Sequence, residues 1–183
     1  MAEQEEDVRR LQFRSALRNF ASGVAVVTVA DGNDVYGMTA SSFTSVSLEP
    51  ALCSVSVNKM STLAEQRSRM HTLLSATDDR YGISILNDRQ GSIADFYARR
   101  PWAIATDVET ISHDGCPVIG GALAWFVCQK WATYDGGDHT IFVGRALAHG
   151  IADDGDLAPL IHHDSRYHQL GEQLAHTDVT NAQ

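Results

Sequence analysis

The chain has 183 residues, of which 44% are hydrophobic and 20% charged, and its formal net charge is −9. This length and composition predict one domain over residues 1–183 that closes its own hydrophobic core. The acidic balance excludes a general nucleic-acid binder, which needs a basic surface, and no apolar segment approaches the length of a membrane span. The N-terminal sequence MAEQEEDVRR lacks the apolar run of a signal peptide, so we expect a cytoplasmic protein.

The first part of the chain has one helical pattern followed by strand patterns. Apolar residues recur at helical intervals from Asp7 to about Ala21, and Gly23 is expected to end that helix. A β-branched run followed by an Asp-Gly-Asn turn predicts a hairpin, with one strand over Val24–Ala30 and a return strand that enters Met38–Ser42. Strict alternation of side chains then predicts a strand over Ala51–Asn58.

The rest of the chain continues this β-rich pattern. A helix is expected to begin at Ser61 or Thr62, either of which can cap it, and to run to about Met70. Further patterns predict a short helix over Gly91–Ala98 and strands over Tyr81–Leu86, Trp125–Thr133 and His139–His149, the last two joined by a Gly-rich turn. Many strands with few helices predict a β-barrel with peripheral helices, because a doubly wound sheet would alternate strands with helices.

Several common sites are absent from the sequence. It contains no G-x-G-x-x-G, Walker A, HExxH or G-x-S-x-G motif. Cys53, Cys116 and Cys128 form no CxxC pair, so we interpret them as small core residues of a reduced protein. His162-His163-Asp164 with His168 is only superficially metal-like, because adjacent histidines diverge on a strand, and no metal site is predicted.

Three segments remain as candidates for a ligand site. Small residues in the segment Met38–Leu48 would let a flat ligand lie against a strand, although a solvent-facing Ser/Thr strand has the same composition. Asn58–Thr62 leads from a strand into a helix start where Lys59 and two hydroxyls could hold a phosphate, although simple capping also fits. His139 follows the Gly-rich turn, where it could meet a ligand or pack in the core with Ile141 and Val143.

Taken in order, the sequence resembles the flavin reductase family of two-component monooxygenase systems, whose members share a split-barrel flavin-binding fold with Greek-key topology. The resemblance covers about residues 13–167. It is carried by the segments FRSALRNFASGVAVVTV, GMTASSFTSVSLEP, NKMST, YGISILNDRQ, ADFYA, DGCPVIGGALAWFVC, GGDHTIFVGRA and APLIHHDSRY. One departure is His162-His163, which stands where the family commonly carries aromatic residues before an Arg-Tyr pair.

The resemblance implies a site for a flavin and a nicotinamide. The flavin ring would lie on residues 39–42 with positions 56 and 57 beneath it, the phosphate would lie at Lys59, and the nicotinamide would approach His139, the implied catalytic residue. Arg166 and Tyr167 offer a second place for the nicotinamide. The implied cofactor contacts are Met38, Thr39, Ala40, Ser41, Ser42, Ser56, Val57, Lys59, Ser61, Thr62, Ser84, Ile85, Gln90, Asp138, His139, Arg166 and Tyr167.

The function that the resemblance implies is NADH-dependent reduction of an exchangeable flavin, FAD or FMN, by hydride transfer to flavin N5. The reduced flavin would supply a partner monooxygenase, and the protein would be a homodimer that binds neither nucleic acid nor membranes. Hydride transfer needs no protein nucleophile, which agrees with the lack of a catalytic triad motif. The alternatives are a non-catalytic flavin- or haem-binding split barrel, a pyridoxamine-phosphate-oxidase-like enzyme and a purely structural dimer.

Overall fold

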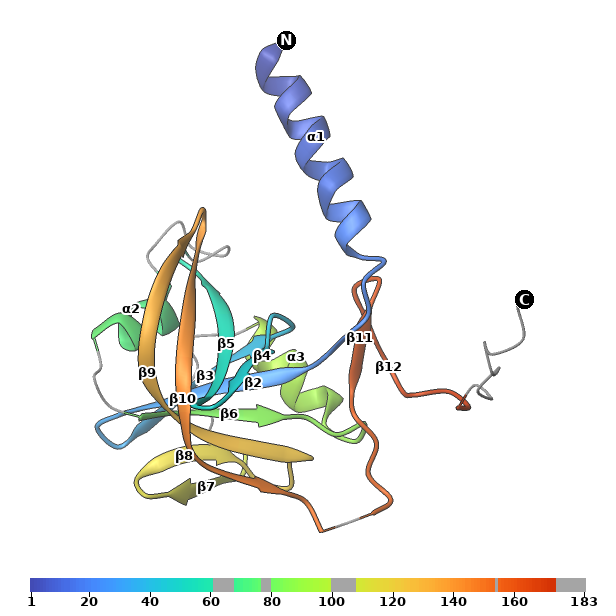
Figure 1. Ribbon diagram of the computed structural model, residues 1–183. Helices are drawn as coiled ribbons and strands as arrows, with labels where there is room; N and C mark the ends of the chain where they lie inside the picture. Colours follow the sequence, from blue (N-terminus) through green and yellow to red (C-terminus); the bar gives the residue numbers. More distant parts are fainter. Residues whose placement is uncertain (61–67, 77–79, 100–107, 154, 174–183) are drawn as a thin grey trace, which may run out of the picture.

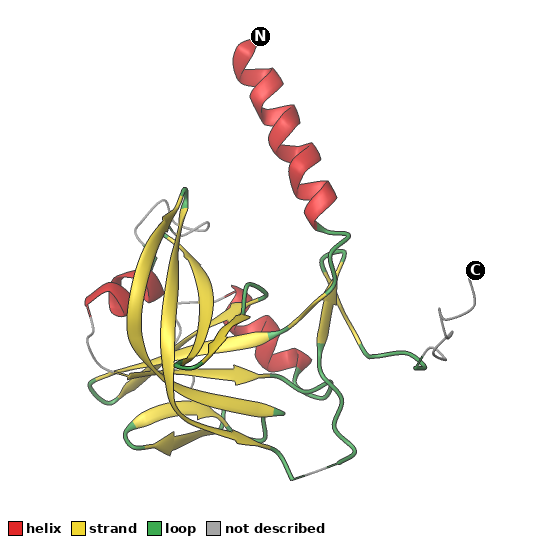
Figure 2. Ribbon diagram, in the orientation of Figure 1, coloured by secondary structure: helices red, strands yellow, loops and turns green. Residues whose placement is uncertain are grey.

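The computed structural model describes residues 1–60, 68–76, 80–99, 108–153 and 155–173. Within these ranges the chain is mainly antiparallel β structure with helices at its periphery (Figures 1 and 2). The helices are α1 (Ala2–Leu17), α2 (Arg69–Ala76) and α3 (Gly91–Arg99). The strands are β1 (Ser22–Gly23), β2 (Ala25–Asp31), β3 (Asp34–Ala40), β4 (Thr44–Leu48), β5 (Ala51–Asn58), β6 (Arg80–Ile85), β7 (Thr110–His113), β8 (Cys116–Ile119), β9 (Ala124–Gly136), β10 (His139–Ile151), β11 (Ile161–His163) and β12 (Arg166–His168).

Seven of these strands form one curved sheet in the order β3-β2-β6-β9-β10-β5-β4, with every neighbouring pair antiparallel. Neighbours that are distant in sequence, such as β2 with β6 and β10 with β5, give the sheet its crossed connections. A three-stranded sheet, β1-β11-β12, and the β7-β8 hairpin lie beside it. The predicted β-barrel with peripheral helices is confirmed.

The core lies on both faces of β2. Ala25, Val27 and Val29 point into one cluster with residues of β5, β6, β9, β10 and α2. Val26, together with Val24 just before the strand, joins a second cluster with α3 and β8. A strand that is buried on both faces has a nearly continuous run of apolar residues in its sequence, and β2 has such a run. Both faces of this strand therefore hold the barrel and its helices together.

The best predicted elements are β5 and the long β9–β10 hairpin. β5 has the predicted bounds, and Cys53, Val55 and Val57 alternate inward as expected. The turn between β9 and β10 contains Gly137, whose φ of +77° is a conformation that favours glycine. All three cysteines are free and buried, as predicted.

The predicted end of the first helix is wrong. The helix α1 ends at Leu17, and Gly23 lies in β1. The side-chain amide of Asn19 donates hydrogen bonds to the carbonyl oxygens of Ser15 and Ala16, at 3.0 and 3.3 Å. The backbone N–H of Asn19 also donates to the Ala16 carbonyl oxygen at 3.2 Å, so Asn19 satisfies the last carbonyls of α1 and ends the helix before the glycine is reached.

The helix predicted after Lys59 needs a similar correction. Its first part, residues 61–67, lies outside the described residues, and α2 begins at Arg69, where the predicted helix was to end. Ser68 caps α2, since its hydroxyl accepts a hydrogen bond from the backbone N–H of His71 at 3.3 Å and its carbonyl accepts one from Thr72. No described helix is long and apolar enough to cross a membrane.

Candidate functional site

The strip of small residues begins at the end of β3 and continues in the loop that follows. Ala40 is buried, whereas Ser41 and Ser42 lie beyond the strand and are exposed. The Thr39 hydroxyl donates to the carbonyl oxygen of Ala94 in α3 at 2.7 Å, so this side chain ties the strip to a helix. The surface that remains open to a ligand in this strip is therefore the loop of Ser41 and Ser42.

This loop contacts β5 directly. The Ser42 hydroxyl accepts a hydrogen bond from the backbone N–H of Ser56 at 3.0 Å and donates one to the carbonyl oxygen of the same residue at 3.1 Å. Ser42 and Ser56, both implied flavin contacts, thus lie side by side. Val57 differs, because the residue is fully buried in the core and pairs with Thr140 of β10.

Lys59 follows β5 and is held by the β9–β10 turn. Its ammonium donates to the Asp135 carboxylate at 2.9 Å and to the Gly137 carbonyl oxygen at 2.7 Å, and its backbone N–H donates to the carbonyl oxygen of Asp138. The hydrogen bond from Lys59 is the main cause that lowers the pKa of Asp135 below its usual value. Ser61 and Thr62, the other implied phosphate contacts, lie outside the described residues.

The turn places Asp138 and His139 at the end of β10. His139 Nδ1 lies 2.6 Å from the Asp138 carboxylate, and this hydrogen bond lowers the pKa of Asp138. The His139 side chain is 39% exposed and is absent from both core clusters, so it can meet a ligand. His139 of β10 pairs with Asn58 of β5. Because Lys59 follows Asn58, this pairing brings the predicted phosphate and nicotinamide contacts next to each other.

Ser84 and Gln90 are internal in this structure. The Ser84 hydroxyl is fully buried and accepts a hydrogen bond from the Ile119 N–H at 2.9 Å. Gln90 accepts from the Asn87 N–H and donates to the Gly120 carbonyl oxygen, so it joins the start of α3 to the loop after β8. These two side chains join other parts of the chain beneath the surface, and their role as flavin contacts stays a prediction.

The side chains of Met38 and Ile85 are partly buried against the main core cluster. Arg166 and Tyr167 lie in β12, in the separate three-stranded sheet, well away from the β9–β10 turn (Figure 1). Tyr167 packs against the second core cluster, and burial raises the pKa of its hydroxyl. The structure therefore divides the implied nicotinamide contacts between two places, of which only His139 adjoins Lys59.

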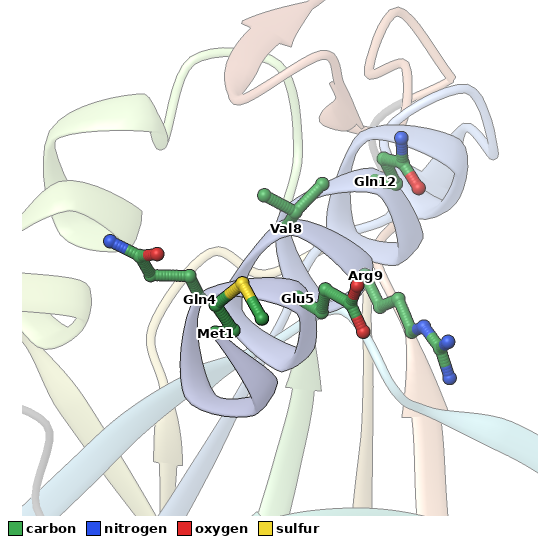
Figure 3. Close-up of a pocket in the computed structure, with 6 residues that line it drawn as sticks. All are labelled: Met1, Gln4, Glu5, Val8, Arg9 and Gln12. Carbon is green, nitrogen blue, oxygen red and sulfur yellow. The ribbon is translucent and has the colours of Figure 1, made fainter.

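Sequence reasoning missed two further features. The Asn87 side chain donates to the Gly121 carbonyl oxygen at 2.7 Å and accepts from the Arg89 N–H. A cavity of about 510 Å³ borders Ser41 and Ser42, and Arg14, Arg18 and His162 also line it. A hollow of about 500 Å³ elsewhere runs along α1 between Met1 and Gln12 (Figure 3); one helix supplies all its lining, so it makes no enclosed site.

The antiparallel barrel with peripheral helices belongs to the class of split-barrel flavin reductases, as its similarity to their solved structures shows. Residues 17–171 match the family model of the flavin reductase like domain, so the chain belongs to this family. It is 34% identical over 163 residues to the NADH-dependent flavin reductase StyB of Pseudomonas fluorescens, covering 88% of this chain and 91% of that protein.

Two solved structures show the same fold. The styrene monooxygenase flavin reductase (SMOB) from Pseudomonas putida S12 superimposes with a TM-score of 0.75 at 36% identity, covering 88% of this chain and 99% of that one. The NADH:FAD oxidoreductase SgcE6 of Streptomyces globisporus C-1027, in complex with NAD and FAD fragments, gives a TM-score of 0.78 at 32% identity over 88% of this chain and 93% of that one. The family resemblance and the split-barrel fold are confirmed.

Proposed function

We propose that this protein is an NADH-dependent flavin reductase that binds FAD or FMN as an exchangeable substrate. The observation that carries the proposal is the junction of β5 with the β9–β10 turn, where Lys59 and His139 lie next to each other in a chain of the flavin reductase family. A single cation suits a phosphate, and a half-exposed imidazole beside it suits a planar, polar ring.

The chemistry is hydride transfer from nicotinamide C4 to flavin N5, which the two bound molecules supply themselves. The chain contributes position and charge. Lys59 attracts the flavin phosphate, the loop of Ser41 and Ser42 offers hydroxyls to a ring edge, and Asp138 fixes the His139 imidazole through the 2.6 Å hydrogen bond. Holding two reactants in a fixed geometry is itself a large part of catalysis in such a reaction.

We also propose that the reduced flavin leaves for a partner monooxygenase and that the protein is a homodimer. The name of the similar P. putida structure, a styrene monooxygenase flavin reductase, supports the first part. Exposed apolar side chains along the projecting helix α1, among them Val8, Leu11 and Leu17, support the second. Light scattering on the purified chain tests the dimer: a monomer mass at micromolar concentration contradicts it.

The decisive experiment follows NADH absorbance with enzyme alone, with flavin alone and with both. The proposal expects rapid NADH oxidation only when enzyme and FAD or FMN are present together. A rate with both components that equals the rate with flavin alone overturns it. In that case, flavin or haem that co-elutes through gel filtration indicates the binding-protein alternative, and oxidation of pyridoxamine phosphate without NADH indicates the other enzyme.

A further inference from the structure

The helix α2 connects the strand end at Lys59 with the strand β10, which carries His139. The Ser68 N–H, just before α2, donates to the Lys59 carbonyl oxygen at 3.1 Å, and the Ser68 hydroxyl accepts from the His71 N–H at 3.3 Å. His71 Nε2 in turn lies 2.8 Å from the Thr140 hydroxyl of β10, within hydrogen-bond distance. A continuous series of contacts therefore runs from Lys59 through the first turn of α2 to Thr140, the neighbour of His139.

Lys59 and His139 are also connected through the strands. His139 pairs with Asn58 of β5, the residue before Lys59, and the Lys59 N–H donates to the carbonyl oxygen of Asp138 at 2.9 Å. The contacts through α2 and the contacts through the strands together form a closed ring. Because the spacing of Lys59 and His139 is fixed by both halves of this ring, neither residue can shift unless α2 follows.

The His71 imidazole lies in a fixed orientation. Its ring meets the buried Phe142 ring edge-on, with the two centroids 5.7 Å apart and an angle of 72° between the planes. The Ser75 hydroxyl lies 3.4 Å from Nδ1, so both ring nitrogens face a hydroxyl group. Successive side chains of a strand point to opposite faces, so Thr140 meets His71 on the face of β10 opposite to His139. An effect of His71 on a ligand at His139 must therefore pass through β10.

The packing of α2 does not depend on the hydrogen bond of His71. Met70 and Leu74 are buried and fix the helix in the main core cluster. At the far end of α2, the Lys130 ammonium of β9 donates to the carbonyl oxygens of Leu74 and Ser75. Because one hydrogen bond between half-buried side chains adds little net stability, His71 contributes mainly to position. It fixes where the first turn of α2 lies against β10.

We propose that His71 is a positioning residue for flavin reduction, an assignment that rests on the proposed function. It holds β10 and the strand end at Lys59 together from behind, and thereby sets the distance between a flavin phosphate at Lys59 and a nicotinamide at His139. Hydride transfer between two stacked rings depends on their separation and alignment, so a small displacement slows the reaction strongly while each molecule still binds. His71 therefore affects the rate of hydride transfer without touching either molecule.

Anaerobic stopped-flow spectroscopy tests this role, because it measures the reduction of bound FMN by saturating NADH in a single turnover. His71→Ala is expected to lower that rate constant about tenfold, while the FMN affinity measured by fluorescence quenching stays close to wild type. His71→Gln, whose amide can still reach Thr140, should recover most of the rate. Thr72→Ala is the matched control on the same helix, since the Thr72 hydroxyl donates to the Ser68 carbonyl oxygen and not to β10, and its rate should equal wild type.

Thr140→Val removes the same hydrogen bond from its other partner and keeps the shape of the side chain, so it also decides the question if His71→Ala does not fold. Its rate should fall as far as that of His71→Ala, and the double variant should be no slower than either single variant, because all three lack one shared contact. Wild-type rates in both single variants below their melting temperatures, or additive losses in the double variant, overturn the proposal. A wild type that reduces no flavin contradicts the proposed function and this role with it, whereas an active wild type with unaffected variants rejects the role of His71 alone.

Discussion

The ammonium of Lys59 lies 2.9 Å from the Asp135 carboxylate, so the residue implied as the phosphate ligand already has an anionic partner. A bound phosphate must compete with that carboxylate for the same cation. Because Asp135 is exposed and the pair lies at the surface, the contact adds little to the stability of the fold. Asp135 therefore bears on ligand affinity more than on folding.

Two substitutions at this pair should change flavin affinity in opposite directions. Lys59→Ala is expected to weaken FMN binding about tenfold or more through loss of a charge-assisted bond, whereas Asp135→Asn should strengthen it by freeing the ammonium. Fluorescence quenching measures both affinities. Riboflavin, which has no phosphate, is the control ligand and should bind all three proteins equally; equal loss of riboflavin and FMN affinity in Lys59→Ala contradicts the phosphate role.

His139→Ala should raise the KM for NADH and leave flavin affinity and melting temperature close to wild type. The side chain is half-exposed and outside the core clusters, so truncation removes a ligand contact and little packing. Asp138→Asn keeps the imidazole but alters its orienting partner, and a smaller rise in KM is expected. A His139→Ala protein that melts early while keeping wild-type NADH kinetics would make His139 structural.

Gly144→Ala should destabilise the barrel by about 1–3 kcal/mol, a common cost of overpacking a core. A Cβ atom at this position would lie 2.1 Å from the Tyr81 hydroxyl and 3.0 Å from Cys128 Cβ, both in the interior. Gly23→Ala is the matched control, since no heavy atom lies within 4 Å of its added Cβ. Urea denaturation measures the stability of both variants. Equal urea midpoints would contradict the prediction and show that β10 can shift to make room for a Cβ atom at Gly144.

The protein should lose stability in alkali through its buried acidic groups. Burial raises the pKa of the Cys116 thiol from 9.0 to about 11 and that of Tyr97 from 10.0 to about 12. The unfolded chain releases the thiol proton near pH 9 and the folded chain keeps it, so the free energy of unfolding falls as pH rises from 9 to 11.

Urea midpoints at pH 8 and pH 10 measure this loss. Cys116→Ala should be less stable at pH 8, because it leaves a small cavity, but its midpoint should fall less between the two pH values than that of wild type. An equal fall of the urea midpoint in wild type and in Cys116→Ala would show that the Cys116 thiol does not titrate with unfolding.

Local patterns predicted the elements whose form depends on neighbours in sequence. The alternation in β5 and the Gly-rich turn of β9–β10 are of this kind, and their bounds agree with the structure closely. The end of α1 was missed because it depends on the Asn19 side chain, and a glycine is the commoner signal.

Local sequence patterns could not predict the contacts between segments that are distant in the chain. Ser84 is internal because its hydroxyl meets Ile119, 35 residues later, and Gln90 because it meets Gly120, 30 residues later. Arg14 and Ser41 line one cavity only after the β1-β11-β12 sheet places α1 against the loop after β3. The adjacency of Lys59 and His139 likewise arises from the pairing of β5 with β10.

The double hydrogen bond of Ser42 to Ser56 also bears on how the protein behaves at high concentration. β4 pairs with β5 only as far as Ser54, so the next outward-facing peptide groups of β5 would form an open edge on which another chain could add a strand. One hydroxyl engages both the N–H and the C=O of Ser56 at that place. The short side chain of one serine thus closes this part of the edge against strand addition by another chain.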